Sequence, residues 1–240
     1  MGKVLIGTAG WSIPRAVAHR FPAEGSGLER YAARFPVLEI NSSFHRPHRP
    51  ATWERWRDSV PDGFRFSVKL PKVVTHERKL VDCREPLADF MSQAGALGEK
   101  LAVVLVQLPP KLDFEAETAD AFFEVLGSLC PAKLACEPRN ASWFRSEADA
   151  LLIEHRVCRV AADPASCKGA GKPGGWRGLS YWRLHGSPRM YRSSYSDCIG
   201  DYARLLREEA AGRETWCVFD NTASGAAAGD ALTLMEALGA

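Results

Sequence analysis

Four side chains that can move protons follow short apolar runs in this 240-residue sequence. They are Glu39, Glu137, Asp163 and His185. Carboxylate and imidazole groups serve as general acids and bases when separate elements hold them around one substrate. Because each of the four comes at the end of a different run, we interpret them as candidate catalytic residues.

A second set of side chains could bind an anion beside them. Arg139 and Arg183 carry forked donors that match a carboxylate or a phosphate, and Lys69 adds a point charge. The small residues after Asn221 open the last predicted helix, where free backbone N–H groups favour phosphate. The candidate substrate-binding residues are Lys69, His76, Arg139, Arg183, Asn41, Trp11, Gln107 and Asn221.

The apolar runs before these residues are the elements that must position them. Their length and their content of β-branched residues predict eight strands. These span Val4 to Gly7, Val37 to Asn41, Phe64 to Leu70, Ala102 to Leu108, Leu134 to Glu137, Val157 to Asp163, Ser180 to His185 and Trp216 to Asp220.

Helical patterns separate most of the runs. They cover Leu28 to Phe35, Ala51 to Ser59, Pro86 to Leu97, Glu115 to Leu129, Ser146 to His155, Asp197 to Ala211 and Ala227 to Leu238. The segment 164–179, PASCKGAGKPGGWRGL, is too rich in Gly and Pro for a helix. We expect a loop there in place of the sixth helix, and its sequence does not say whether it forms a lid.

The alternation of strands and helices predicts one parallel α/β sheet in a single domain over residues 1–240. An open sheet would gather polar groups at one crevice, whereas a closed barrel brings every strand end round one mouth. Polar residues end almost every run, and residues two apart share a face, as do Glu137 and Arg139. The sequence favours a TIM (β/α)8-type barrel with a loop replacing the helix after strand six.

Composition narrows the class of protein without naming a partner. The formal net charge of +2 is too small to indicate a nucleic-acid or membrane partner. The seven cysteines include no C-x-x-C pair, which favours reduced thiols. No apolar span reaches about twenty residues, and the amino terminus lacks a signal-peptide core. We therefore expect a cytoplasmic protein with no membrane partner, and its oligomeric state stays open.

Several segments also carry a resemblance that covers nearly the whole chain and keeps its order. They are GTAGW at 7–11, EINSSF at 39–44, VKLPKVVTHERKL at 68–80, LGEKLAVVLVQLPP at 97–110, EPRNASWF at 137–144, WRLHG at 182–186 and FDNTASGAAAGDA at 219–231. Together they resemble the YecE-like family, also called domain of unknown function seventy-two. The resemblance implies a TIM barrel and implies no particular reaction.

Three positions depart from that family's pattern. Asp220, Asn221 and Thr222 stand where the family tends to have Asn-Asn-Asp. Asp230 stands where Asn is usual, and His45 stands where Tyr is common. A family role for the acid after the last strand is therefore not expected in this chain.

Our preferred hypothesis is an enzyme that acts on an anionic, phosphate- or carboxylate-bearing substrate by acid–base or hydrolytic chemistry at the barrel mouth. In it His185 with Glu137 or Asp163 moves protons. The substrate is a small molecule or derives from a nucleic acid. A purely structural alternative also stays open, in which pairs such as Glu137 and Arg139 neutralise one another and bind no substrate.

Two other functions stay open. The first is a divalent-metal-dependent hydrolase or phosphodiesterase, with Mg²⁺, Mn²⁺ or zinc as the cofactor. Its ligands would come from Glu39, Glu137, Asp163, His185 and Asp220. The second is a non-catalytic nucleic-acid-binding protein that uses the same basic mouth.

Overall fold

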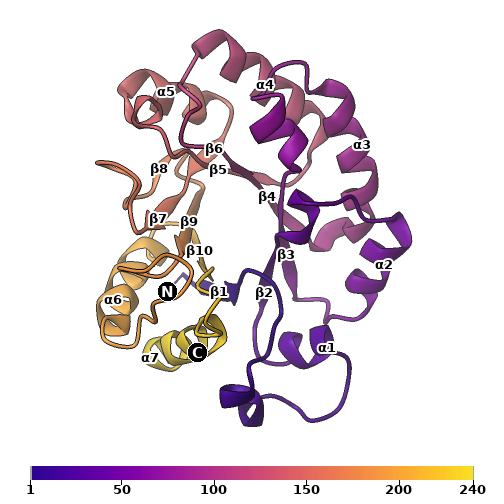
Figure 1. The fold of residues 1–240 in the computed structure, drawn as a ribbon, viewed down its shortest axis with the longest axis vertical. Helices are drawn as coiled ribbons and strands as arrows, with labels where there is room; N and C mark the ends of the chain where they lie inside the picture. Colours follow the sequence, from indigo (N-terminus) through magenta and orange to yellow (C-terminus); the bar gives the residue numbers. More distant parts are fainter. Residues whose placement is uncertain (1, 240) are drawn as a thin grey trace.

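A ring of parallel strands surrounded by helices makes up the computed structural model, which describes residues 2–239 (Figure 1). The sixth strand of the ring is interrupted at Val160, so that β6 and β7 are its two halves. The strands are β1 Val4–Thr8, β2 Val37–Ile40, β3 Arg65–Lys69, β4 Leu101–Gln107, β5 Lys133–Glu137, β6 Val157–Arg159, β7 Ala161–Asp163, β9 Leu179–Leu184 and β10 Glu214–Phe219.

Strand pairing closes the ring into a barrel. One sheet runs β1-β10-β9-β7 and the other runs β2-β3-β4-β5-β6, with all of these neighbours parallel. A parallel bridge between Ala9 and Glu39 joins β1 to β2. Below it the buried Tyr31 hydroxyl accepts from Thr8 N at 2.8 Å and donates to Val37 O at 3.0 Å. A side chain thus replaces a ladder bond where the two sheets meet. The TIM-barrel prediction is confirmed.

The seven predicted helices lie on the outside of the barrel. They are α1 Gly27–Ala32, α2 Pro50–Asp58, α3 Arg84–Ala94, α4 Ala116–Leu129, α5 Ser146–Glu154, α6 Ile199–Ala210 and α7 Ala227–Leu238. Between β7 and β9 the chain has no helix, as expected, but a two-residue strand, β8 Gly174–Gly175, pairs antiparallel with β6. Short helical turns that the sequence did not predict follow β1, β2, β3 and β5 at Arg15–Arg20, Ser42–Phe44, Val73–Glu77 and Ala141–Phe144.

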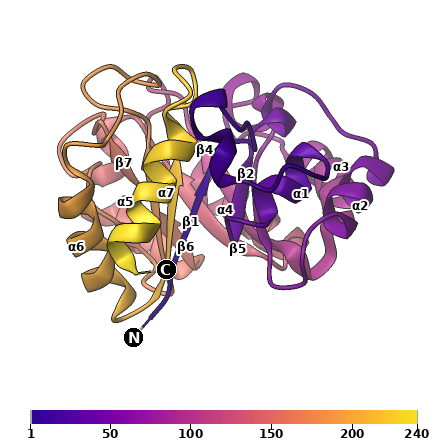
Figure 2. The same ribbon diagram turned by 90° about the horizontal axis from the view of Figure 1, so that it is seen from below.

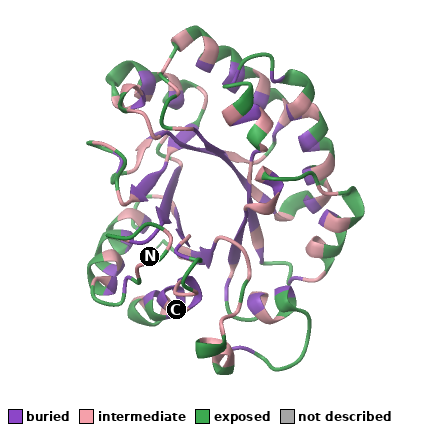
Figure 3. Ribbon diagram, viewed as in Figure 1, coloured by how far each residue is buried: buried purple, intermediate pink, exposed green. Residues whose placement is uncertain are grey.

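Two apolar layers stabilise the barrel. The larger lies between the strands and the helices, and Figure 3 shows the buried strands inside a ring of helices with exposed outer faces. The smaller fills the barrel interior, where Leu179 and Tyr181 of β9 pack with residues from the other strands. Further along the same face of β9 come Arg183 and His185. The interior therefore changes from apolar to ionic toward the carboxyl ends of the strands.

Figure 2 shows the barrel from the side, with the amino terminus at one end and the loops that follow the strands at the other. Those loops form the mouth above the ionic part of the interior. Within residues 2–239, no helix is long and apolar enough to cross a membrane.

Candidate active site at the barrel mouth

Arg183 lies at the centre of the ionic layer and is 1% exposed. Its Nε and Nη2 atoms donate to the two carboxylate oxygens of Glu39 at 3.0 and 2.7 Å, which makes a bidentate pair. Its Nη1 atom donates to Glu137 at 2.5 Å, and Nη2 also donates to Asp220 at 3.0 Å. Three carboxylates thus use four of the five guanidinium N–H groups.

His185, which directly follows β9, contacts two of these carboxylates. Its Nδ1 atom lies 2.9 Å from Asp220 Oδ2, and its Nε2 atom lies 3.3 Å from Glu137 Oε1. Burial alone would lower the pKa of His185, but the negative charge of Glu137 and the hydrogen bond with Asp220 raise it above the ordinary 6.5. We call Arg183, His185, Glu39, Glu137 and Asp220 the Arg183 cluster.

Glu137 and Asp220 of the Arg183 cluster are held in their charged form. Burial would raise the pKa of Glu137, but Arg183 and His185 bring it well below its ordinary value. The pKa of Asp220 is lowered against burial by the same two residues. Arg139 adds an outer contact, because its Nε atom donates to Glu137 Oε1 at 3.1 Å. A buried carboxylate without such partners would be costly, so the cluster depends on its cations.

Lys69 lies on β3 beside the cluster. Its Nζ atom stands 4.0 Å from the centre of the Phe44 ring. In the described part of the chain no carboxylate oxygen lies within 4.0 Å of this amine. Burial and the charge of Arg183 lower the pKa of Lys69 to about 8, although Glu137 and Glu39 oppose the shift. The amine therefore exchanges protons near neutral pH.

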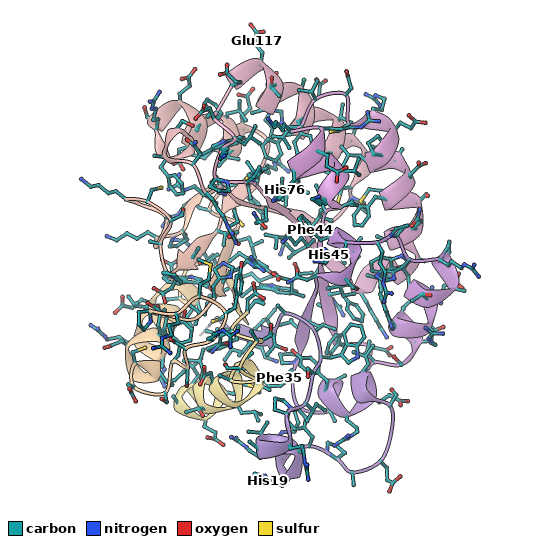
Figure 4. The ribbon with its side chains drawn as sticks, viewed as in Figure 1. His19, Phe35, Phe44, His45, His76 and Glu117 are labelled. Carbon is teal, nitrogen blue, oxygen red and sulfur yellow. The ribbon has the colours of Figure 1, made fainter. Side chains whose placement is uncertain are left out.

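His76 stands at the open side of the same mouth, on the helical turn after β3. Figure 4 shows it next to Phe44, and the two rings meet edge to face with their centres 4.9 Å apart. Thr75 Oγ1 lies 2.8 Å from Nδ1 and orients the ring. Burial and the positive charges of Lys69 and Arg139 lower the pKa of His76, which favours its neutral form.

Three further candidates differ in what they contact. Asn41 follows Glu39 on the inward face of β2, and its Oδ1 atom is buried with no hydrogen-bond partner among residues 2–239. Gln107 donates to the backbone oxygen of Leu108 at 2.8 Å. Trp11 packs edge to face on Trp56, with the ring centres 5.3 Å apart. Of the three, Asn41 alone has a fully buried polar atom without a hydrogen-bond partner among residues 2–239.

Two other candidates point away from the Arg183 cluster. Val160 faces the barrel interior, so Asp163, three residues later, projects from the opposite face of the strand. There it accepts a hydrogen bond from the Tyr195 hydroxyl at 2.7 Å. Asn221 is fully buried and donates to Asp230 at 2.7 Å, which ties the loop after β10 to α7. The structure does not bring either residue to the mouth.

Tyr181 and Phe44 belong to the site although they were not among the sequence candidates. The Tyr181 hydroxyl donates to Glu39 Oε2 at 2.9 Å and so helps to hold that carboxylate. A signal for it existed, because Tyr181 precedes Arg183 by two residues and therefore shares its face. Phe44 gave no such signal, since it lies on a helical turn beyond the end of β2.

A cleft of about 670 Å³ opens beside the mouth. Phe44 forms part of its wall and also contacts Lys69, so one ring lies between the cleft and the amine. A cavity of this size can hold most of a small organic molecule. Its lining combines aromatic, imidazole and charged groups, among them Phe44, His45, His48, Trp53, Lys72 and Phe90.

The Arg183 cluster does not fit a divalent metal as it stands. A metal would need carboxylate oxygens that now accept from Arg183, and its charge would lie next to the guanidinium. Among residues 2–239, no group of three or more His, Cys, Asp or Glu side chains is arranged to hold a metal ion. The guanidinium thus supplies the positive charge that a metal would bring.

The raised pKa of His185 gives the site a measurable pH dependence. Its ion pairs stabilise the fold fully below the ordinary value of about 6.5 and are lost as the pH rises through the folded-state pKa. We expect the free energy of unfolding to fall as the pH rises above about 6.5, by up to about 1.4 kcal/mol per pH unit. Urea denaturation should show this fall in the wild type and not in His185→Gln.

The exposed His19 provides the matched control for that measurement. The His19→Gln variant should keep the wild-type slope, because His19 makes no contact with the cluster. If the free energy of unfolding fell equally with pH in the wild type and in His185→Gln, the pH dependence could not be assigned to His185.

Comparison with known proteins identifies the family. The model of the family described as "Protein of unknown function DUF72" matches residues 5–240. The chain belongs to this family. Among curated DUF72 relatives, YecE of Escherichia coli K12 is 29% identical over 126 residues, or 52% of this chain and 44% of that protein. YunF of Bacillus subtilis 168 is 30% identical over 147 residues, or 59% and 52%. The aligned regions span about half the length of these relatives, and the resemblance noted in the sequence is confirmed.

DUF72 proteins of known structure share the fold along the whole chain. One from Enterococcus faecalis V583 superposes with a TM-score of 0.84 at 19% identity, covering 99% of this chain and 96% of that one. One from Thermotoga maritima MSB8 gives 0.80 at 25% identity, with 99% of each chain covered. A D-allulose 3-epimerase from Methylomonas sp. gives 0.58 at 13% identity over 98% and 97%. That last likeness shows a common barrel fold.

Proposed function

We propose that this DUF72 protein is an enzyme that binds an anionic, phosphate- or carboxylate-bearing substrate at the barrel mouth and acts on it by proton transfer. The observation that carries the proposal is the Lys69 amine, which is half-buried and has no carboxylate oxygen within 4.0 Å among residues 2–239. A cationic group in such a place is costly unless something pairs with it. An anion from the substrate would fill that role.

Arg139 is the second cation that supports an anionic ligand. It uses its Nε atom toward Glu137 and keeps its two terminal NH2 groups outside that ion pair. Those groups can hold a carboxylate or a phosphate through two parallel hydrogen bonds. Arg183, by contrast, is engaged by three carboxylates, so we now assign to it the positioning of the cluster rather than contact with the substrate.

Proton transfer falls to the groups that combine access with a suitable pKa. Lys69, with a pKa of about 8, meets this condition near neutral pH, and the lowered pKa of His76 favours a neutral ring that can accept a proton. His185 and Glu137 lie beneath them, each about 1% exposed, and fix the charges that surround the amine. The cleft beside Phe44 would take the remainder of the substrate.

The proposal predicts that Arg139→Met weakens anion binding by about tenfold to a hundredfold, since a charged hydrogen bond contributes roughly 1.5–3 kcal/mol. Binding is measured by calorimetry with inorganic phosphate, pyrophosphate and citrate, and then with whichever sugar phosphates raise the melting temperature. Arg145→Met is the matched control, because Arg145 is exposed in the same loop region.

Equal affinities for Arg139→Met and the wild type would overturn this assignment. Binding of oligonucleotides but of no small anion, with an affinity that falls steeply with salt, would instead favour the nucleic-acid-binding alternative.

A further inference from the structure

The Lys69 amine is placed as a nucleophile as well as a cation. It is the last residue of β3 and shares the inward face with Ser67, so the strand holds its stem rigidly inside the barrel. In the described chain the amine has neither an ion-pair partner nor a hydrogen-bond acceptor, and its contact is the face of Phe44. No hydrogen bond among residues 2–239 involves Nζ, so no donor of the described chain occupies the electron pair of the neutral amine.

We propose that Lys69 forms a Schiff base with a carbonyl group of the substrate. This inference rests on the proposed function and narrows it, because the substrate then carries an aldehyde or a ketone as well as its phosphate or carboxylate. Arg139 would hold the anionic group while Lys69 reaches the carbonyl carbon. A keto acid or a phosphorylated aldehyde has both features.

The reaction balances with the groups at the mouth. The Nζ electron pair bonds to the carbonyl carbon, and the carbon–oxygen π pair moves to oxygen, which takes the proton that nitrogen releases. His76 can relay this proton, because its Nδ1 atom is bound to Thr75 and its Nε2 atom is left for exchange. A second proton then lets the hydroxyl leave as water while the carbon–nitrogen double bond forms. Starting from the ammonium form, Lys69 and the carbonyl give an iminium and water.

The surroundings favour the iminium once it forms. Glu39 and Glu137 lie close enough for their charges to act on Lys69, and they act on a positive iminium in the same way. The Phe44 ring covers one side of the nitrogen and keeps water from it. At the same time burial keeps the pKa of the free amine near 8, so part of it is neutral at physiological pH.

Reductive trapping tests the inference on the wild-type protein. The probe is glyoxylate, which carries an aldehyde and a carboxylate, with cyanoborohydride to reduce any imine, and the modified lysine is located by peptide mass spectrometry. Lys72 is the internal reference, because it is exposed and pairs with Glu77 at 3.2 Å. We expect Lys69 to react at least about tenfold faster than Lys72, since its lower pKa gives it a larger neutral fraction.

Two further measurements separate this inference from the function on which it rests. Inorganic phosphate should slow the labelling of Lys69 and not that of Lys72. The Lys69→Arg variant should lose the fast adduct, while Lys72 in the same variant should be labelled as in the wild type. Phosphate binding without preferential labelling of Lys69 would overturn the Schiff base and leave the anion site standing. Preferential labelling that phosphate does not slow would support the Schiff base and count against the anion site.

Discussion

Replacing Arg183 with methionine is expected to lower the free energy of unfolding by about 3–5 kcal/mol, because it leaves buried carboxylates without their cation. Glu39 loses a bidentate partner, and Glu137 and Asp220 each lose one hydrogen bond. Methionine keeps much of the length of the side chain, so the lost charge rather than a cavity dominates. Urea denaturation at neutral pH measures the effect.

The dependence of this loss on pH identifies its cause. Without the guanidinium, the effect of burial on Glu137 is less opposed and raises the pKa of this carboxyl, so its protonated form favours the folded state. The deficit of the variant should therefore shrink as the pH falls toward about 5, where it can also be refolded if it is not recovered at neutral pH. Arg177→Met, at an exposed position, should leave stability unchanged. A deficit below about 1 kcal/mol at every pH would show that Arg183 does not hold the cluster.

The architecture of the barrel interior explains why so much depends on one residue. A barrel of this kind can be filled by layers of aliphatic side chains alone. Here the apolar packing stops at Tyr181 and Val218. The next inward positions hold Arg183 of β9 and Asp220, which directly follows β10. Such a layer contributes less stability than apolar packing would, but it places fixed charges beneath Lys69 and sets its electrostatic surroundings. This arrangement is the physical basis of both proposals.

The sequence predicted that these charged residues meet because of two features: their two-residue spacing within strands, and their position at the strand ends. Arg183 and His185 lie two residues apart in an apolar run, and so do Glu137 and Arg139, which puts each pair on one face of a strand. Since parallel strands bring their carboxyl ends together, residues far apart in the chain had to meet at one mouth. Glu39, Glu137, Arg183 and His185 do meet there.

What the sequence could not decide was the facing of Asp163 and the pairing within the layer. In the sixth barrel strand Arg159 shares a face with Asp163, but Val157 and Ala161 on that face are apolar too. The pattern therefore does not decide whether Ala162 or Asp163 points inward. Likewise, the sequence pattern around an arginine at a strand end is the same whether its side chain binds a ligand or three carboxylates. That choice depends on distances across the barrel, as between Arg183 and Glu39, and no local pattern records them.

Removing the guanidinium altogether should turn the cluster into a metal site. In Arg183→Ser the carboxylates of Glu39, Glu137 and Asp220 would surround the space left by the arginine, with His185 beside two of them. These are the ligand types that Mn²⁺ and Zn²⁺ take, and a metal would restore the missing positive charge.

We therefore expect Mn²⁺ to raise the melting temperature of Arg183→Ser by about 5–10 °C at a hundredfold excess over its dissociation constant, which corresponds to about 2.7 kcal/mol. The wild type should not respond, because Arg183 already occupies the carboxylates. Adding Asp220→Asn removes one ligand and should reduce the shift in the variant. An equal response of wild type and variant would mean that the metal binds elsewhere and that the guanidinium does not take the place of a cation. A rise in the melting temperature of Arg183→Ser alone would establish that the three carboxylates lie close enough to share one positive charge. The same arrangement of carboxylates sets the electrostatic surroundings of Lys69.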